Sequence, residues 1–239
     1  MKLFKDWTKF EKSLSFGSIF IIILVGIIFK SDMLTTSCSV VGVITAFLHA
    51  KGKNLGQVFW LIITALYSIV SFRNKYYGEV LIYLTIMLPM YIAGIISWAK
   101  HKNIETNSVE VNTIKKQEVL IIAILSSGIY IGIYHLLKIF NTEELIISTT
   151  SVLISMLAMY FQVRRSKHSF SFYLVNDIIL MLLWGIPVIK GNLLLFPMFI
   201  NPIINLISDI YGLYNWKRIE KIQKKNTKKK EAKVAKKHK

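Results

Sequence analysis

Long apolar segments separated by short charged stretches constrain the fold of this 239-residue chain more than any other feature. A helix needs about 17–25 mostly apolar residues to cross the ~30 Å hydrocarbon core of a bilayer. Because lipid offers the backbone no hydrogen-bond partners, segments of this length must be helical. The sequence therefore predicts an all-α polytopic membrane protein of about eight transmembrane helices. The apolar segments cover roughly residues 16–30, 34–50, 56–72, 78–99, 118–138, 147–163, 170–189 and 193–215.

The basic residues are distributed unevenly between alternate loops. With the N-terminus inside the cell, the inner loops carry 13 Lys and Arg residues before the C-terminal tail, and the outer loops carry 5. Cytoplasmic loops of membrane proteins typically carry the excess of Lys and Arg. This asymmetry predicts eight spans with both termini in the cytoplasm.

Much of the net charge of +17 comes from the C-terminal tail, residues 217–239, which contains 12 of the 30 Lys and Arg residues. A Lys-rich tail next to a span is typical of a solvated cytoplasmic tether near anionic lipid headgroups. We therefore expect the lipid bilayer, and not nucleic acid, to be the macroscopic partner of this charge.

Enzyme and metal signatures are missing from the sequence. It contains neither a phosphate-binding Gly-x-x-x-x-Gly-Lys-Ser/Thr loop nor a Gly-x-Ser-x-Gly or His-Glu-x-x-His motif. Cys38 is the only cysteine, so an intrachain disulfide and a Cys-based metal site are excluded, and the five His are scattered. We expect no metal, no cofactor and no enzymatic activity.

The two halves of the sequence share short patterns at a nearly constant offset. Thr35-Thr36-Ser37 and Thr149-Thr150-Ser151 each open an apolar segment, 114 residues apart. The basic turns Lys51-Gly52-Lys53 and Arg165-Ser166-Lys167 follow at the same offset. Such an internal repeat in a membrane protein is typical of transporters, in which related halves enclose one substrate path.

A Gly-x-x-x-Trp pattern closes each half, at Gly94–Trp98 and Gly212–Trp216. The offset spans four helices, an even number, so both halves point the same way, as parallel repeats do. The predicted units are an N-terminal segment with an extra helix (1–33), a first three-helix repeat (34–99), a cytoplasmic linker with a linking helix (100–146), a second three-helix repeat (147–216) and the Lys-rich tail (217–239).

Polar side chains at membrane depth are the first candidates for a functional site. Asp177 lies in the seventh apolar segment and Asp209 in the eighth, where ionisable groups are costly and mark functional positions. Asn201, Asn205 and Asp209 are spaced by four and share one helix face. We interpret Asn176 and Asn205 as substrate contacts and the two aspartates as candidate charge partners. The alternative is that these groups only join helices through hydrogen bonds.

Aromatic residues form a second candidate set. Trp60 and Tyr67 share a face of the third segment, and Trp184 lies deep in the seventh. With Tyr91 of the fourth segment, these rings could stack on a flat heterocycle, at ~1–3 kcal/mol per ring. The alternative is packing against lipid or other helices. Trp98 and Trp216 precede basic residues, so we interpret them as anchors at the membrane interface.

An ordered series of these short motifs runs through residues 1–218. In the first half they are Ala50-Lys51-Gly52-Lys53, Tyr67, the run Lys75–Val80, Leu88-Pro89-Met90 and Gly94–Trp98. In the second half they are Thr149, the run Ser151–Ala158, Arg164-Arg165, Val175-Asn176, Trp184 and Ile210–Trp216. Their order and spacing resemble the PnuC family of nicotinamide riboside transporters.

This resemblance implies a bacterial inner-membrane protein with three-plus-one-plus-three helices, similar to SWEET sugar carriers, plus an N-terminal helix. It implies facilitated diffusion of a vitamin, nicotinamide riboside, which a cytoplasmic kinase then phosphorylates and traps. The resemblance also implies a homotrimer, although no residue pattern in the chain marks a self-association face.

The chain departs from the family pattern at positions that bear on the substrate. The family's Asn-Tyr-x-Phe-Gly stretch is replaced by residues 56–60, of which only Phe59 matches, and Tyr91 stands where Gln is common. Another vitamin or nucleoside, such as thiamine, riboflavin or a deoxynucleoside, therefore remains an alternative. So do proton coupling through Asp177 or Asp209 and, from other classes, a membrane-embedded enzyme or a receptor.

Overall fold

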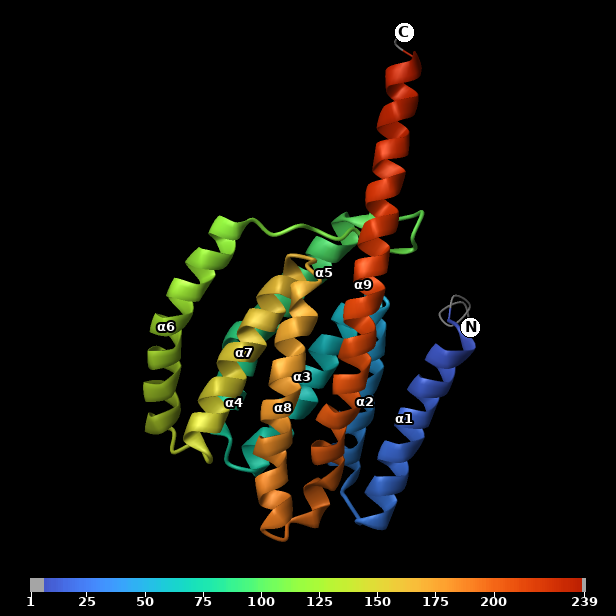
Figure 1. Ribbon diagram of the computed structural model, residues 1–239. Coiled ribbons are helices and arrows are strands. Elements are labelled where there is room, and N and C mark those ends of the chain that lie inside the picture. Colours follow the sequence, from blue (N-terminus) through green and yellow to red (C-terminus); the bar gives the residue numbers. More distant parts are fainter. Residues whose placement is uncertain (1–6, 238–239) are drawn as a thin grey trace.

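The computed structural model describes residues 7–237. The first six residues of the predicted N-terminal segment and residues 238–239 of the tail lie outside the described residues. Within the described part, eight helical stretches are long and apolar enough to span a membrane, which confirms the all-α polytopic fold (Figure 1). The helices are α1 (Lys9–Ile28), α2 (Met33–Ala50), α3 (Leu55–Arg73), α4 (Tyr77–Ile82), α5 (Leu88–Lys100), α6 (Lys116–Ile139), α7 (Leu145–Val163), α8 (His168–Ile189) and α9 (Phe196–Lys237).

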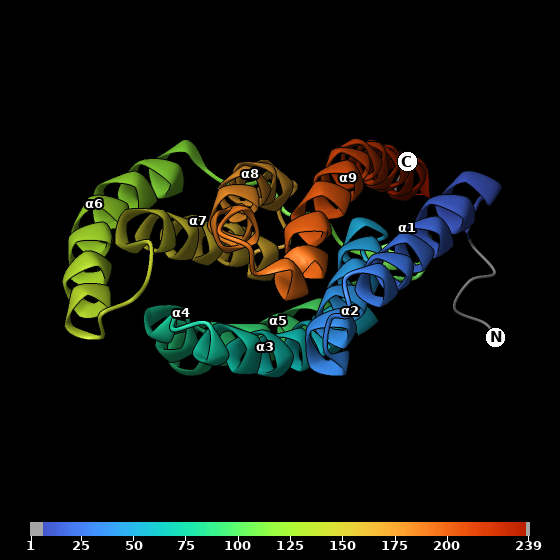
Figure 2. The ribbon, with the colours of Figure 1, turned by 90° about the horizontal axis from the view of Figure 1, so that it is seen from below.

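Six neighbouring helices close into a ring. Helix α2 packs against α3, α3 against α5, α5 against α7, α7 against α8, α8 against α9, and α9 returns to α2. In Figure 2 the ring is a double row, with α2, α3 and α4–α5 facing α7, α8 and α9. Helix α1 packs outside against α2 and α9, and α6 packs outside against α7. The ring thus consists of two three-helix groups, here called the triplets: α2, α3 and α4–α5, and α7, α8 and α9. Their relation as parallel repeats stays a prediction.

The fourth span is a single rod with a wide turn in the middle. Helix α4 continues through a π-helical turn, Tyr83–Met87, directly into α5. The amide of Leu88 bonds the carbonyl of Tyr83 five residues earlier, one residue further back than in an α-helix. Pro89 follows at the start of α5 and has no amide hydrogen to contribute. π-Helical turns of this kind frequently lie at functional sites, and this one begins at a tyrosine of the central cavity described below.

One end of the bundle carries the basic turns at 51–54 and 164–167, and we call it the basic end. The segment 101–115 lies at the same end and is called the strap. The strap contains a short hairpin, β1 (Lys102–Asn103) with β2 (Ser108–Val109). The amide of Val109 donates to the carbonyl of Gly52 (3.0 Å), and that of Asn112 donates to the carbonyl of Arg165 (2.9 Å). The strap therefore ties together the basic turns of both triplets.

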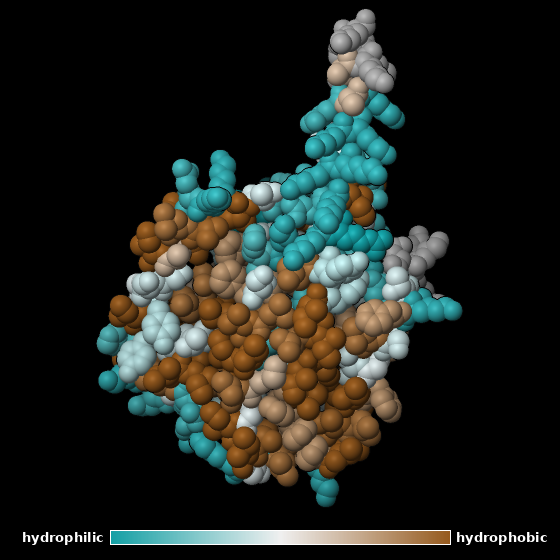
Figure 3. All heavy atoms as spheres, viewed as in Figure 1, coloured by the Kyte–Doolittle hydropathy of each residue, from teal (hydrophilic) through white to brown (hydrophobic). Residues whose placement is uncertain are grey.

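Helix α9 runs through the bundle and continues far beyond the basic end (Figure 1). The Lys-rich tail, expected to be a solvated tether, extends this helix to Lys237. Beyond Pro202 the segment lacks proline, and its Lys, Glu, Gln and Ala residues favour helix. Figure 3 shows the extension as a hydrophilic rod above a broad hydrophobic belt. Hydrogen bonds from Lys230 and Asn226 of this rod lower the pKa of Glu105 in the strap.

Helix α1 is fixed to the ring by a buried carboxylate at the basic end. Thr8 and Glu11 form a capping box at the start of α1. Glu11 also accepts hydrogen bonds from Lys51 Nζ (2.9 and 3.0 Å) and from the hydroxyl of Tyr211 on α9. Glu11 is only 5% exposed, so this cluster joins α1 to both α2 and α9 at a point shielded from water.

Candidate functional site

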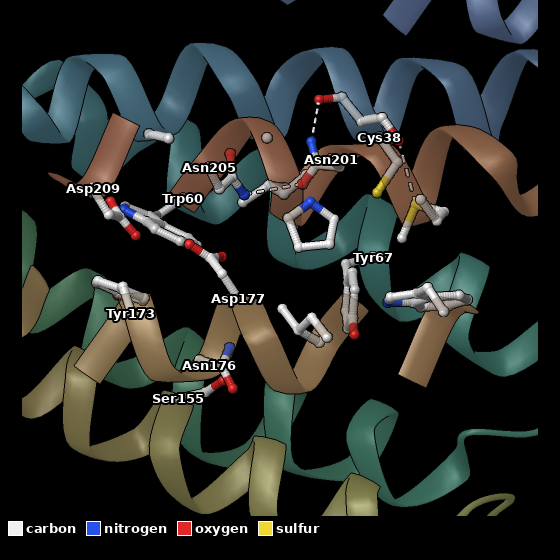
Figure 4. A pocket seen from close by; sticks show the side chains of 18 of the residues that line it. Cys38, Trp60, Tyr67, Ser155, Tyr173, Asn176, Asp177, Asn201, Asn205 and Asp209 are labelled. Carbon is white, nitrogen blue, oxygen red and sulfur yellow. Dashed lines mark hydrogen bonds between the residues drawn. The ribbon is translucent and has the colours of Figure 1, made fainter. Parts of the chain in front are cut away.

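A cavity of about 90 Å³ lies inside the six-helix ring. This volume is smaller than the ~300–1,000 Å³ typical of small-molecule sites, so a ligand must move some of the lining side chains to enter. Side chains from α2, α3, the fourth span, α7, α8 and α9 line it, so both triplets contribute (Figure 4). The structure brings all eight predicted site residues to this cavity: Trp60, Tyr67, Tyr91, Asn176, Asp177, Trp184, Asn205 and Asp209.

Small side chains on α2 provide the space for the cavity. Cys38, Ser39, Gly42 and Ala46 follow one another at intervals of one to four residues along the lining. A Cβ atom on Gly42 would lie 2.9 Å from the amide nitrogen of Asn201, closer than real contacts allow. This close approach lets Asn201 donate to the carbonyl of Ser39 (2.7 Å) and so join α9 to α2.

The asparagines of α9 divide their roles between packing and the cavity. Asn205 donates to Asn201 Oδ1 (3.0 Å), which supports the predicted face of residues spaced by four. Asn205 Oδ1 is buried and has no hydrogen-bond partner within residues 7–237. Asn176 on α8 accepts from Ser151 (3.3 Å). Asn201 therefore joins helices, while Asn205 keeps an acceptor for a ligand.

Two carboxylates meet inside the cavity. Asp177 on α8 and Asp209 on α9 are each 4% exposed, and Figure 4 shows both reaching into the same space. Asp209 thus lies well inside the bundle. Among the described residues, neither Lys nor Arg lines the cavity, and Asp177 Oδ2 lacks a hydrogen-bond donor. Buried carboxylates without a cation nearby are costly, so either a shared proton or a positively charged ligand stabilises this pair.

Aromatic rings fill the middle of the cavity differently from the expectation. Trp60 stacks nearly parallel on Tyr91 (5.2 Å between ring centroids, 7°) and on Tyr173 (5.6 Å, 13°). The indole thus already has two ring partners. A flat ligand must lie beside this three-ring stack or displace one of its tyrosines.

Tyr67, Tyr76 and Trp184 form an aromatic wall at the end of the cavity away from the basic end, and a buried glutamate supports this wall. Tyr67 and Trp184 meet edge to face at 5.8 Å, and Trp184 also meets Tyr76 at 5.2 Å. The hydroxyl of Tyr67 donates to Glu79 Oε2 at 2.5 Å. Glu79 is 1% exposed and lies behind the wall, outside the lining itself. It fixes the orientation of the Tyr67 ring.

The basic end of the cavity is closed by a second aromatic group around His49. The imidazole stacks on Phe170 (4.5 Å, 17°) and lies 5.7 Å from Trp98 and from Trp216. The interpretation of these two tryptophans as interface anchors is wrong, because they are 1% and 0% exposed. Their indole N–H groups donate to carbonyls near helix ends, Trp98 to Gln162 and Trp216 to His49.

Comparison with known proteins agrees with this architecture. Residues 32–218 match the family model described as nicotinamide mononucleotide transporter. The chain belongs to the nicotinamide mononucleotide transporter family. A curated relative, the nicotinamide riboside transporter PnuC of Neisseria mucosa, is 26% identical over 234 residues, which cover 92% of this chain and 85% of the relative.

A solved structure supports the fold of this family member. The crystal structure of the vitamin B3 transporter PnuC superposes with a TM-score of 0.82 at 23% identity, covering 92% of this chain and 95% of the other. The similarity to PnuC transporters seen in the motifs is thereby confirmed. Because the relatives are transporters, the prediction that the chain is not an enzyme is confirmed as well.

Several residues of the cavity were missed by the sequence interpretation. His49 is one of five scattered histidines, which predict no metal site, and Tyr173 lies outside the motifs that resemble the family. Glu79 lies in a motif, Tyr77-Gly78-Glu79, whose position near a segment end gave no sign of burial. A usable signal is the spacing of four and then three residues, which puts Gly42, Ala46 and His49 on one face of a span.

Proposed function

We propose that this chain carries nicotinamide riboside across the bacterial inner membrane by facilitated diffusion. The observation that carries the proposal is the charge of the cavity, which has two carboxylates, several aromatic rings and, over residues 7–237, no lining Lys or Arg. Nicotinamide riboside has a flat, positively charged ring, which suits both aromatic faces and carboxylates. The names of the similar transporters support the same substrate.

The same charge argues against the mononucleotide that the family description names. A phosphate monoester carries about −1.5 to −2 charges at neutral pH and needs Arg, Lys or helix N-termini to bind it. Asp177 and Asp209 would repel such a group inside a cavity of low dielectric. The riboside is therefore the better ligand of the two.

We place the basic end in the cytoplasm. Both basic turns and the Lys-rich part of α9 lie at this end of the bundle. Cytoplasmic surfaces of membrane proteins carry the excess of Lys and Arg. Net uptake of a cation through a carrier without energy coupling stops at the level that the membrane potential sets, unless the substrate is removed inside the cell. Phosphorylation by a cytoplasmic kinase does this, because the cavity disfavours the anionic product.

Access to the cavity would alternate between its two aromatic closures. At the basic end the closure contains His49, Trp98 and Trp216, and at the other end it contains Tyr67 and Trp184. Relative motion of the triplets, with the π-turn of the fourth span as a flexible point, would open one closure at a time. Asn176, Asn205, Asp177 and Asp209 would hold the ligand between them.

A binding and transport experiment tests this function. Calorimetry of the purified protein with nicotinamide riboside, its mononucleotide, thiamine, riboflavin and deoxynucleosides should show binding of the riboside and much weaker binding of the mononucleotide. Asn176→Ala and Trp184→Ala should abolish riboside uptake into liposomes while the protein still inserts. Normal uptake by both variants would refute the assigned site. Tight mononucleotide binding would refute the charge argument.

The pair of carboxylates also supports a second candidate, proton-coupled transport. Asp177 and Asp209 are buried together, and carboxylates inside membrane proteins frequently form proton relays. In liposomes without a trapping kinase, an imposed pH gradient would then drive accumulation above the external concentration, and an uncoupler would abolish it. Facilitated diffusion predicts equilibration in both conditions.

The homotrimer stays a prediction, which light scattering of the protein in detergent tests.

A further inference from the structure

The basic turns of the two triplets share one backbone pattern in the structure. Gly52 and Arg165 both have positive φ, 64° and 56°, and lie 113 positions apart. The amide of Gly52 donates to the carbonyl of His49 (2.8 Å), and that of Arg165 donates to the carbonyl of Gln162 (2.9 Å). This offset of 113 is one residue shorter than the offset of 114 between the sequence motifs. With an offset of 113, Gln162 is the counterpart of His49.

Side-chain hydrogen bonds give the same register. The indole of Trp216 donates to the carbonyl of His49 (3.1 Å), and the indole of Trp98 donates to the carbonyl of Gln162 (2.8 Å). These two tryptophans close the two Gly-x-x-x-Trp patterns. His49 and Gln162 thus occupy equivalent places at the ends of α2 and α7.

The glycines of the same patterns identify a second equivalent pair. A Cβ atom on Gly94 would lie 2.7 Å from Oε1 of Gln57, and one on Gly212 would lie 2.2 Å from the ring of Phe170. Gln57 and Phe170 are also 113 positions apart, near the starts of α3 and α8. Phe170 is therefore the counterpart of Gln57.

One of the two equivalent places holds a hydrogen-bonded polar group, in which only Gln57 Nε2 lacks a partner among the described residues. The side chain of Gln162 donates to Gln57 Oε1 (3.0 Å) and accepts from the hydroxyl of Tyr173 (2.7 Å). Both glutamines are 0% exposed. This chain of three side chains crosses from the first triplet to the second and satisfies both polar atoms of the Gln162 amide.

The other place holds the same three positions with the polar partners missing. His49 occupies the place of Gln162, and Phe170 occupies the place of Gln57. Trp60 lies 113 positions before Tyr173 and occupies the place of that tyrosine. Both ring nitrogens of His49 and Nε1 of Trp60 are buried and have no hydrogen-bond partner in the described part of the chain. His49 is 1% exposed, both side chains line the cavity, and the Tyr173 ring lies 5.6 Å from each ring.

We propose that His49 and Trp60 form an open polar pair that the transported ligand completes. Buried polar atoms without a partner are a minority in proteins. In the described part of the chain six of them belong to side chains that line this cavity, and three of the six are on His49 and Trp60. The ligand would take the place that the Gln57–Gln162–Tyr173 chain fills with its own atoms. His49 is thus a specificity-determining residue of the binding site in addition to a part of its closure.

The chemistry of the pair defines the ligand group. Trp60 Nε1–H only donates, whereas a neutral imidazole has one donor and one acceptor. A neutral group that both accepts and donates, either a hydroxyl or a primary carboxamide, satisfies both side chains at once. Nicotinamide riboside carries both kinds of group, so in this form the inference rests on the proposed function.

Calorimetry on full-length variants in detergent tests the pair. His49→Leu and Trp60→Phe, which keep apolar or aromatic bulk, should each weaken riboside binding about tenfold, because each removes one buried hydrogen bond to the ligand. The double variant should lose little more than either single variant, since both act on one ligand group. His49→Gln, which places the residue of Gln162 at this position, should retain most of the affinity. His135→Leu, on the exposed face of α6, serves as the control.

Two ligand analogues identify the group involved. A pyridinium riboside without the carboxamide, or one without ribose hydroxyls, should bind His49→Leu as well as wild type if the missing group is the one that contacts His49. Unchanged riboside affinity in folded His49→Leu and Trp60→Phe would overturn the pair. If wild type binds thiamine, riboflavin or a deoxynucleoside instead, the proposed function fails, and the same variants with that probe decide the pair separately. If none of these probes binds, both proposals fail.

Discussion

The contact between Gly212 and Phe170 allows the packing at the basic end to be tested quantitatively. A Cβ atom on Gly212 would lie 2.2, 2.7 and 2.9 Å from three ring carbons of Phe170, whereas ordinary contacts begin near 3.4 Å. In Gly212→Ala the ring must therefore retreat by more than ~1 Å. It has little room to do so, because Phe170 is 0% exposed and packs on His49 (4.5 Å) and Trp216 (5.4 Å).

Overpacking of this kind costs about 1–3 kcal/mol. For a chain of this size, about 2–4 °C of melting temperature corresponds to each kcal/mol, so Gly212→Ala should melt about 2–12 °C below wild type. Thermal unfolding in detergent measures this difference. Riboside affinity should fall as well, because a displaced Phe170 shifts the imidazole that stacks on it.

Two other glycines provide graded comparisons. Gly128→Ala is the matched control, since a Cβ atom there has nothing within 4 Å. Gly94→Ala should have an intermediate effect, because its Cβ atom meets the flexible end of Gln57 at 2.7 Å. Phe170→Leu in the Gly212→Ala background should recover part of the loss. Equal melting temperatures for Gly212→Ala and Gly128→Ala would refute the reasoning.

Two buried carboxylates outside the cavity give further predictions. Glu79→Leu leaves the Tyr67 hydroxyl without its acceptor, so we expect about 1–3 kcal/mol of lost stability and weaker riboside binding, with Glu79→Gln restoring most of both. Equal melting temperatures and affinities for the Leu and Gln variants would contradict this role. Glu11→Leu should lower stability by about 1–3 kcal/mol, because it removes the buried carboxylate that accepts from Lys51, Tyr211 and the amide of Thr8. Lys51→Met should cost clearly less in that background than in wild type, and strictly additive losses would show that the pair is not coupled.

The membrane fold could be predicted from the sequence because it depends on length and composition alone. Eight apolar segments with alternating loop charge correspond to the eight candidate spans of the structure. Residues that line the cavity could be singled out for a related reason, although their role as a binding site stays a prediction. Asp177 and Asp209 are conspicuous at membrane depth, and the packing of α8 against α9 buries them in the same cavity.

What the sequence could not show depends on contacts between distant residues. Trp98 precedes a basic residue, as interface tryptophans do, yet it bonds a carbonyl on another helix and is buried. His49 carries no local sign that its ring nitrogens lack partners. The strap hairpin is only two residues long on each side and is held by the turns it joins, so its own sequence has little preference for strand.

Helix α9 links the cavity to the outside of the bundle through one continuous rod. Asp209 lies at the cavity, and the same helix ends at Lys237, 28 residues further. At ~1.5 Å per residue this is a lever arm of about 42 Å, so a tilt of about 10° at the cavity would move the far end by ~7 Å. The extension therefore magnifies motion that is small inside the membrane. A pair of distance probes, one on α6 and one on the extension in water, would report each opening of the carrier as a displacement of several ångströms.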